Sequence, residues 1–345
     1  MLLNELFAEA TKDIPSRSKE AKKLMYYNED QIDEGGNVFA GKTGPIKLEN
    51  IKPTLTAYFG ELQKLFPKKA GIFNEQNFVA LGSVGKKPES GDIDLGVSAT
   101  DLLDQQMSDQ SIAEWGIDPK VVASDFELLK KRARTSTPEQ LRMKAFLLNL
   151  VKHINAHAPR LHCEEKKVTD GNIFGLFPQL TPDGKEVGTG VQVDWMIGDL
   201  KWLKFSYHSA AYPAGSNVKG LHRTQLMLAA FQVANLSFNH VNGVKDKETG
   251  QVIAKDPENA LAVLNKRLGV KITPADAEDY YKLNKVLKTQ MKPEDYSKMV
   301  DIYLKILDST RADIPDDLQD EWRDRRDRLG LTGKFLPDTS ALRTQ

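Results

Sequence analysis

Two aspartates one residue apart interrupt an apolar run in the stretch SGDIDLGV (residues 90–97). Side chains two residues apart on a strand point to the same face, so Asp92 and Asp94 are expected to project together. Two like charges this close are unfavourable unless something positive lies between them. The chain must therefore fold so that a positive group or ion reaches this pair.

A third carboxylate stands in a similar setting much later in the chain. Asp194 lies in VQVDWMIG (residues 191–198), an apolar run of alternating pattern in which a lone carboxylate needs compensation. Asp199 follows the same run and is the alternative third member. Carboxylate oxygens are the ligands that Mg²⁺ prefers, and this ion leaves positions open for substrate phosphates. The sequence predicts a metal site at Asp92, Asp94 and Asp194.

A glycine and a short basic turn precede the aspartate pair. Gly82 permits close backbone approach, and the hydroxyl of Ser83 with nearby free N–H groups can hold phosphate. Lys86 and Lys87 follow in the same turn and are placed to meet phosphate charge. We expect Gly82-Ser83 to end one strand and to open a helix.

The hydrophobic pattern outlines the secondary structure on both sides of these motifs. It predicts a helix over residues 51–66 and a strand over residues 71–82. Thr137-Pro138 is typical of a helix start, and the helix is expected to run to about residue 157. Pro182-Asp183-Gly184 predicts a hairpin turn between two strands. A second hairpin is expected over residues 241–255, and a charged helix over residues 316–328.

These elements divide the chain into three expected regions: a helical N-terminal element with its linker (1–46), a mixed α/β domain (47–205) with a helical insertion at about 100–158, and a mainly helical domain with a small hairpin (206–345). The rarity of strand–helix alternation argues against a doubly wound nucleotide fold. We therefore expect the α+β class, with a mixed sheet flanked by helices.

Composition says more about the cellular compartment than about the reaction. Lys+Arg and Asp+Glu both number 48, so no global charge favours or excludes a nucleic-acid partner. Cys163 is the single cysteine, which excludes an internal disulfide and fits a reducing compartment. No apolar run is long enough to span a membrane, and the N-terminus lacks the pattern of a signal peptide. These features predict a cytoplasmic protein without a membrane partner.

The ordered motifs resemble those of the DNA polymerase β-like nucleotidyltransferase superfamily. Gly-Ser, a basic turn, SGDIDL and a distant VDW are similar to the palm motifs of family X DNA polymerases. The likeness continues into AYPAGSNVKGLHRTQLMLAAF, where Tyr212, Gly215, Ser216 and Arg223 stand in comparable places. It extends to about residue 270 and implies a polymerase β-like palm with a helical C-terminal domain.

The resemblance implies a reaction and its participants. A nucleoside monophosphate is transferred from a nucleoside triphosphate to a hydroxyl, with a DNA or RNA 3′ end as the leading acceptor. Two Mg²⁺ ions, for which Mn²⁺ can substitute, are implied at the three aspartates. Residues implied to bind nucleotide are Gly82, Ser83, Lys86, Lys87, Ser216, Lys219 and Arg223.

Several other functions remain open at this point. The acceptor can instead be a tRNA, a small molecule or a protein, or the chain can be an inactive nucleotide- or nucleic-acid-binding protein. The basic stretch LLKKRARTS (residues 128–136) fits either a phosphate-tracking surface or a solvated helix face. His153, His157, His162 and Cys163 lack the carboxylate or second pair that would complete a tetrahedral zinc set.

Overall fold

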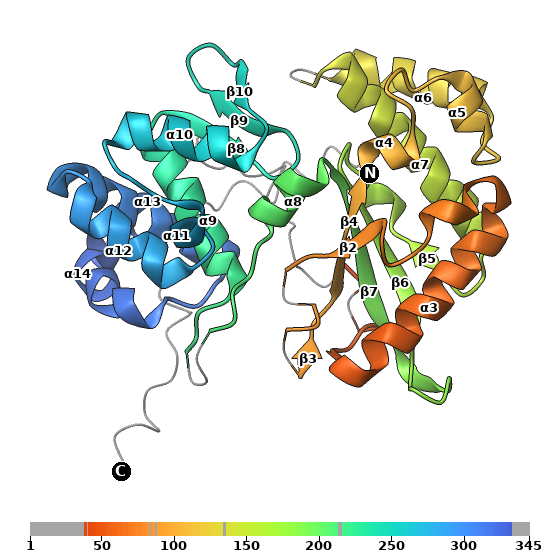
Figure 1. Cartoon of the computed structure of the whole chain (residues 1–345), viewed down its shortest axis with the longest axis horizontal. Helices are drawn as coiled ribbons and strands as arrows, with labels where there is room; N and C mark the ends of the chain where they lie inside the picture. The colour runs from red at the N-terminus through yellow and green to blue at the C-terminus, as the bar shows by residue number, and fades with distance from the viewer. Residues whose placement is uncertain are drawn as a thin grey trace, which may run out of the picture. The chain divides into compact units, whose positions relative to one another are not determined.

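The computed structural model describes residues 38–39, 41–82, 84–86, 88–133, 136–212 and 216–332 (Figure 1). The helical element expected over residues 1–46 lies mostly outside the described residues, as do Ser83 and Lys87. The described chain builds two main hydrophobic clusters, one within residues 46–197 and one within residues 202–322. The first cluster packs against one face of the large sheet, and the second lies in the helical C-terminal region.

The large sheet has five strands in the order β2-β4-β7-β6-β5. Their bounds are Phe78–Ala80, Ile93–Ser98, Glu186–Gly198, Asn172–Leu180 and His162–Cys163. β4 and β7 pair in parallel, whereas the other neighbours are antiparallel. The short strands β1 (Ile46–Lys47) and β3 (Glu89–Ser90) form a separate antiparallel pair. The sheet is therefore mixed, and with its flanking helices it confirms the α+β class.

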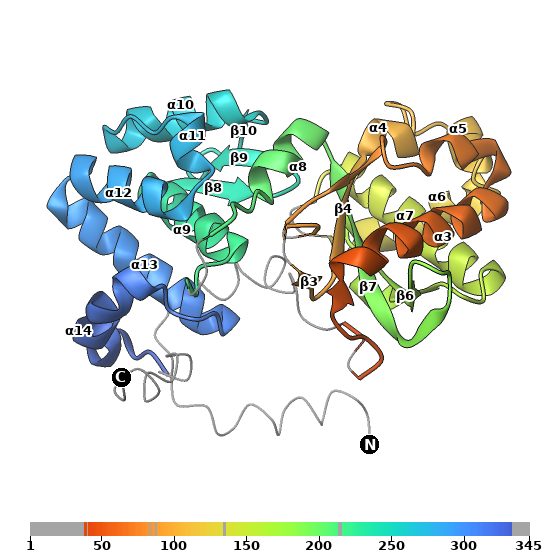
Figure 2. The ribbon, with the colours of Figure 1, turned by 60° about the horizontal axis from the view of Figure 1, so that its bottom comes forward.

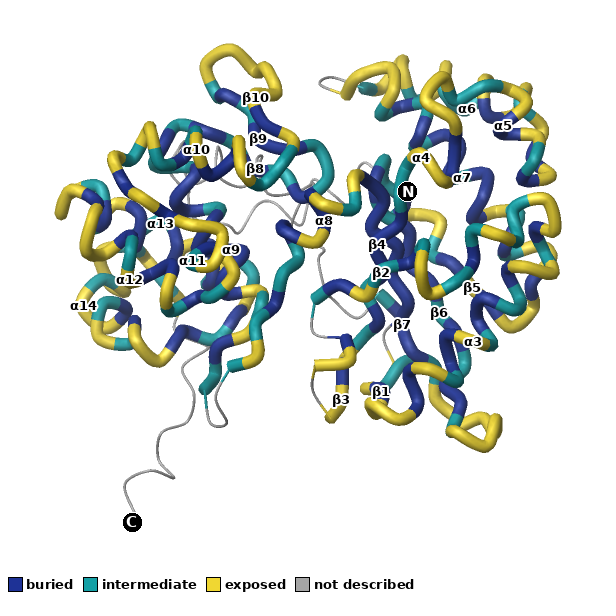
Figure 3. The backbone as a smooth tube through the Cα atoms, viewed as in Figure 1, coloured by how far each residue is buried: buried dark blue, intermediate teal, exposed yellow. Residues whose placement is uncertain are grey.

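Alternation along the two central strands gives the sheet one apolar face. Ile93, Leu95 and Val97 of β4 belong to the first hydrophobic cluster, as do Val193 and Trp195 of β7. Helices α3 (Leu48–Leu65) and α7 (Pro138–His157) contribute to the same cluster and lie on that side of the sheet (Figures 1 and 2). The backbone of both strands is buried along most of its length (Figure 3). Residues at the intervening positions face the opposite side of the sheet.

The helices expected over residues 51–66, from Thr137-Pro138 to about residue 157, and over residues 316–328 are confirmed within a few residues, including the capped start of α7. The Thr137 hydroxyl accepts from Gln140 N at 3.3 Å, and Thr137 N donates to the Gln140 side chain at 2.9 Å. This reciprocal capping satisfies N–H groups that a helix start leaves unpaired. The predicted insertion at about 100–158 is helical throughout much of its length. Its helices are α4 (Ala99–Leu102), α5 (Asp109–Ala113), α6 (Pro119–Arg132) and α7.

The strand expected over residues 71–82 is wrong in its length, because only Phe78–Ala80 is extended. Pro67–Ile72 forms a 3-10 helix, and the Asn74 side chain then accepts from the backbone N–H groups of Gln76 and Asn77. An asparagine that bonds its own backbone in this way makes a turn instead of extending the strand. The apolar residues before it pack without joining the sheet.

Both expected hairpins are confirmed. β6 and β7 meet at the Pro182–Gly184 turn, where Thr181 N donates to Lys185 O at 2.9 Å. The second hairpin consists of β9 (Gly243–Asp246) and β10 (Val252–Ala254). A third strand, β8 (Leu236–Asn239), extends it to a three-stranded sheet that the sequence pattern did not indicate.

The C-terminal region is mainly helical, as predicted. Its helices are α8 (Leu200–Ser206), α9 (Gly220–Val233), α10 (Pro257–Leu268), α11 (Pro274–Ala277), α12 (Tyr280–Gln290), α13 (Pro293–Thr310) and α14 (Gln319–Leu329). Two further 3-10 turns occupy Glu165–Lys167 and Asp316–Leu318. Among the residues that the structure describes, no helix is both long and apolar enough to cross a membrane.

Candidate metal centre

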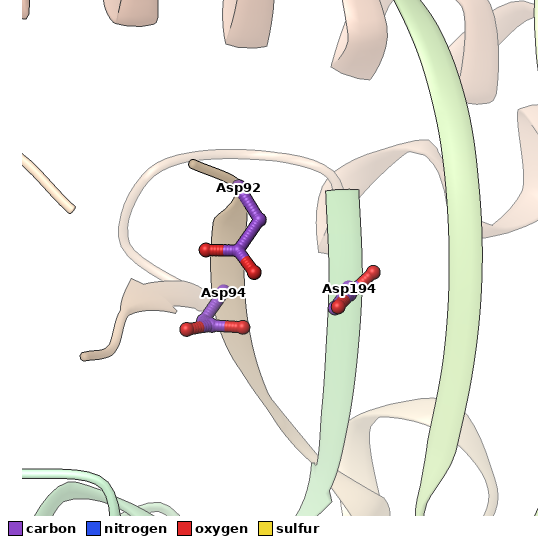
Figure 4. A group of neighbouring side chains, drawn as sticks. All are labelled: Asp92, Asp94 and Asp194. Atoms are coloured by element: carbon purple, nitrogen blue, oxygen red, sulfur yellow. The ribbon is translucent and has the colours of Figure 1, made fainter. Parts of the chain in front are cut away.

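The structure brings Asp92, Asp94 and Asp194 together. Each offers a carboxylate oxygen, and these ligand atoms all lie within 4.8 Å of one another. Figure 4 shows the three side chains gathered at the two neighbouring strands from which they come. A cluster of this size and charge could hold a metal ion, because carboxylate oxygens are suitable ligands for hard cations.

Strand register explains how residues so far apart in sequence meet. In the parallel pairing of β4 with β7, Asp94 and Asp194 are direct partners. Each aspartate stands between two apolar residues that point into the first hydrophobic cluster, so both carboxylates must face the other side of the sheet. Asp92 directly precedes β4 and extends the same face by one position. The hydrophobic pattern of the strands therefore determines the face of the sheet on which the carboxylates lie.

Asp194 occupies the most enclosed position of the three. It is only 1% exposed, and its Oδ2 accepts a hydrogen bond from Gln192 Nε2 at 2.8 Å. Its Oδ1 is buried and has no hydrogen-bond partner among the described residues. Burial raises the pKa of this carboxyl well above its ordinary value, and the charge of Asp92 raises it further. A buried carboxylate oxygen without a partner fits a bound cation.

Burial also raises the pKa of Asp92. In the metal-free protein the ionised forms of Asp92 and Asp194 are both penalised by loss of hydration. A cation between them would reverse this penalty, because it favours the charged forms. The electrostatics of the site therefore favour a protonated or metal-bound state over three free carboxylates.

This penalty predicts a pH-dependent stability. A carboxyl whose pKa is raised by folding destabilises the folded state above that pKa, and the penalty vanishes below the unfolded value. We expect metal-free Asp194→Asn to exceed the wild type in unfolding free energy by about 1–3 kcal/mol at neutral pH. The difference should shrink as the pH falls through the raised pKa toward 3.8. Urea unfolding in a chelator measures it, and a difference that grows on acidification would contradict the expectation.

Gly82 lies against Asp94 in a conformation that favours glycine. Its φ is +57°, and a Cβ placed there would lie 2.8 Å from Asp94 Oδ2. Leu81 N donates to Asp94 O at 2.9 Å, and Gly82 N donates to Tyr207 O at 3.1 Å. The helix expected after this glycine is wrong: residues 84–86 form turns. The left-handed glycine and nearby Pro88 leave no room for a helix before β3 begins.

Gly82→Ala should therefore disturb the site more than the fold. A side chain at positive φ costs about 1–2 kcal/mol, and this one would also displace the Asp94 carboxylate. We expect Mn²⁺ affinity to fall by about tenfold or more, because displacing a metal ligand weakens metal binding. Calorimetric Mn²⁺ titration checks this result.

The matched control is Gly184→Ala in the β6–β7 turn. Gly184 also has a positive φ, +79°, but a Cβ there would meet nothing within 4 Å. It should lose similar stability while its Mn²⁺ affinity stays at the wild-type level. Equal losses of affinity in the two variants would show that backbone strain, and not contact with Asp94, is responsible.

Lys86 lies in the turn after Gly82. Its ammonium donates to Gly82 O at 3.0 Å and to Ser209 O at 2.8 Å, and burial lowers its pKa. The side chain therefore connects the turn to the segment that follows α8. Its neighbours Ser83 and Lys87 lie outside the described residues.

The three predicted nucleotide contacts in the C-terminal region have protein partners. Ser216 Oγ lies 2.7 Å from the Tyr281 hydroxyl, and Lys219 Nζ lies 3.1 Å from an Asp313 carboxylate oxygen. Arg223 is 0% exposed, so none of its surface is available to a ligand in this structure.

Arg223 instead connects helices of the C-terminal region. Its Nε donates to Ala277 O at 2.6 Å, and its Nη1 donates to Phe205 O at 2.7 Å and to Ser206 O at 3.3 Å. The guanidinium also lies over the Phe205 ring, 4.9 Å from its centroid. Burial lowers the pKa of Arg223 to about 10.

The competing sites do not assemble in the part of the chain that the structure describes. There, the aspartate triad is the one group of three His, Cys, Asp or Glu residues close enough to share a metal ion. Asp199 caps α8 by accepting from Trp202 N at 2.9 Å. His153 and His157 stack at 4.3 Å, and the His157 ring bonds the His153 carbonyl. Lys130, Lys131 and Arg132 are exposed in the last turn of α6.

Sequence reasoning missed Gln192, which touches Asp194. A signal was present, because residues two apart on a strand share a face and Gln192 stands two positions before Asp194. Gln192 is only 3% exposed, which is unusual for a polar side chain unless its amide is satisfied.

Comparison with known proteins adds little to this geometry. No protein-family model matches the chain, and no curated protein matches it. A solved structure that resembles it is a polymerase β of Leishmania infantum, described as a ternary P/T complex. The match covers 80% of this chain and 87% of that chain, at 15% sequence identity and a TM-score of 0.35. At this TM-score the likeness supports no functional assignment.

Proposed function

We propose that this protein is a metal-dependent nucleotidyltransferase that moves a nucleoside monophosphate from a nucleoside triphosphate to a hydroxyl, with release of pyrophosphate. The observation that carries the proposal is the aspartate triad, whose ligand atoms lie within 4.8 Å of one another on one face of a mixed sheet. The order of the motifs, with Gly82-Ser83 and a basic turn before Asp92, supports the same reaction.

The triad would hold two Mg²⁺ ions, and Mn²⁺ can replace them. When bound, these ions lower the pKa of an acceptor hydroxyl and neutralise charge that develops on the transferred phosphoryl group. Asp92 and Asp94 serve the nucleotide side of the site, and all three aspartates serve the acceptor side. Asp194 orients the acceptor hydroxyl and accepts its proton, a role that requires a carboxylate within hydrogen-bond reach of that hydroxyl.

The turn between β2 and β3 is proposed to receive the triphosphate. Gly82 brings the backbone close to Asp94, and Lys86 supplies positive charge in the same turn. Ser83 and Lys87 complete this proposal on the strength of the sequence motif. Positioning and electrostatics would supply most of the rate acceleration, because phosphoryl transfer requires little covalent chemistry from the protein.

A nucleic-acid 3′ hydroxyl is the proposed acceptor. The sequence resemblance to family X DNA polymerases continues past the triad to about residue 270, which favours a polymerase-like acceptor over a small molecule. Ser216, Lys219 and Arg223 belong to that stretch. Because Arg223 is fully buried, its proposed role requires that the C-terminal region rearrange when substrate binds.

The test offers labelled NTPs and dNTPs, with Mg²⁺ or Mn²⁺, to the full chain together with DNA, RNA and tRNA acceptors. Wild-type protein should extend or modify at least one acceptor, and Asp94→Ala should not. Equal inactivity of both proteins on every acceptor, together with equal nucleotide binding, would overturn the proposal. Salt-sensitive nucleic-acid binding that survives loss of the aspartates would instead indicate a binding protein.

A further inference from the structure

Gln192 joins the triad to the beginning of the described chain. Its Nε2 donates to Asp194 Oδ2 at 2.8 Å, and its Oε1 accepts from Val38 N at 3.0 Å. The side chain is 3% exposed, so neither hydrogen bond competes strongly with bulk water. One amide therefore connects a catalytic carboxylate with a backbone far away in sequence.

The two partners determine how the amide is oriented. A backbone N–H can only donate, so the atom facing Val38 must be the amide oxygen. The amide nitrogen then faces Asp194, whose ionised carboxylate can only accept. The reversed orientation would place two donors against each other at Val38 and two acceptors at Asp194. Gln192 is thus held in one state when Asp194 is charged.

Val38 belongs to a segment that runs beside β7, which we call the edge segment (residues 38–39 and 41–46). Gly44 N donates to Gly190 O at 3.0 Å, and Gly190 N donates to Lys42 O at 3.1 Å. β4 begins its pairing with β7 only at Val193, so the edge segment supplies partners to β7 before that point. Asp194 follows this stretch of β7 within a few residues.

We propose that Gln192 is a positioning residue, which holds Asp194 Oδ2 so that Oδ1 remains available to a metal ion and which couples the edge segment to the metal centre. The inference rests on the nucleotidyltransferase function proposed above. Oδ1 is the buried atom without a partner among the described residues, whereas Oδ2 is occupied by Gln192. A carboxylate with one oxygen held in this way loses rotational freedom before any ion binds, which favours binding.

A purely structural role for Gln192 is the rival explanation, and Gln179 separates the two. Gln179 is 2% exposed and also ties down the edge segment, with Nε2 donating to Gly44 O at 3.0 Å and to Gly190 O at 3.1 Å. It does not hydrogen-bond Asp194. Gln179→Met and Gln192→Met therefore both loosen the edge segment and both replace a buried amide by an apolar side chain. Only Gln192→Met removes the support of the carboxylate.

The experiment measures Mn²⁺ binding to the full chain by calorimetry, alongside thermal unfolding of each variant. Gln192→Met should bind Mn²⁺ about 10–100-fold more weakly than wild type, the usual effect of removing a partner of a metal ligand. Gln179→Met should remain within about threefold of wild type, although both variants lose similar stability. In transfer assays Gln192→Met should lower kcat and leave KM for the nucleotide nearly unchanged.

Val38→Pro provides a second variant that leaves every side chain of the site intact. Proline has no N–H, so the amide oxygen of Gln192 loses its donor while the bond to Asp194 can persist. We expect Mn²⁺ affinity to fall by about two- to tenfold, in line with the loss of one hydrogen bond. If Gln192→Met fails to fold, this variant still tests the coupling to the edge segment, and Gln192→Glu, which places a second carboxylate against Asp194 Oδ2, tests the positioning role by a loss of Mn²⁺ affinity relative to Gln179→Glu.

The possible failures are distinguishable. If Asp94→Ala binds Mn²⁺ as tightly as wild type, the triad is not a metal site, and both the proposed function and the role of Gln192 are overturned. If Asp94→Ala loses binding but Gln192→Met matches Gln179→Met, only the positioning role is overturned. Wild-type affinity in Val38→Pro would overturn the coupling to the edge segment.

Discussion

Asp194→Asn should reduce nucleotidyl transfer by about a thousandfold or more. The substitution keeps the shape of the side chain but removes the negative charge of a shared metal ligand, and a catalytic metal ion contributes several kcal/mol of charge stabilisation. It also removes the proposed proton acceptor. Single-turnover assays with saturating nucleotide measure the loss directly. Because burial penalises the charge in the metal-free state, the variant should lose activity while it gains stability.

Asp199→Asn is the matched control for this substitution. Asp199 lies just beyond the same strand and caps α8, a task that asparagine performs about as well. It should keep nearly full activity and stability. Retention of more than about a tenth of wild-type transfer by Asp194→Asn would show that Asp194 is not an essential ligand. Parallel losses in both variants would point to damage of the strand end and not of the metal centre.

Arg223→Ala should lower the unfolding free energy by about 3 kcal/mol. It empties the volume of a large buried side chain and leaves three backbone carbonyls without their donor. Relief from burying a charge offsets part of this loss, since burial lowers the pKa of Arg223 to about 10. Urea unfolding measures the change. The loss of stability of the C-terminal region should therefore be larger than any change in nucleotide affinity.

Arg142→Ala tests whether the loss is specific to the buried position. Arg142 lies near the start of α7 and forms an exposed ion pair with Asp109 at 3.3 Å. Its removal should lower the unfolding free energy by less than about 1 kcal/mol. If Arg223→Ala retained wild-type stability and instead raised KM for the nucleotide, the buried position of its guanidinium would not be the position it holds when nucleotide binds. That result would favour a direct contact between Arg223 and substrate.

The sequence could predict those features that depend on interactions between residues close together in the chain. Thr137-Pro138 specifies a helix start with its own side chain, and Pro182-Asp183-Gly184 specifies a turn within a few residues. The face on which Asp92, Asp94 and Asp194 lie was also predictable, because a carboxylate flanked by apolar strand residues has only one face left to occupy. That Asp194 lies beside the other two depends on the pairing of β4 with β7, which the order of the motifs implied and which strand alternation alone does not give.

The features that could not be predicted depend on contacts distant in sequence. The hydrogen bond between Val38 and Gln192 links residues 154 positions apart, and no sequence pattern near either residue indicates it. Arg223 is a charged residue that sequence reasoning places on a surface or against a ligand, yet carbonyls from two other elements enclose it. The strand expected before Gly82 was too long because the Asn74 side chain accepts hydrogen bonds from the backbone just after it and makes a turn. The spacing of hydrophobic residues does not indicate such a turn.

The direct pairing of Asp94 with Asp194 has a consequence for quality control during folding. If β4 slipped by one residue along β7, its aspartate would turn into the aromatic interior, and Leu95 would be carried out of it. A molecule with a broken metal centre of this kind would thus also have a broken core, and would expose apolar surface to proteases and chaperones. Stably folded molecules with a misplaced triad should be rare, because the same slip that separates Asp94 from Asp194 also exposes the core.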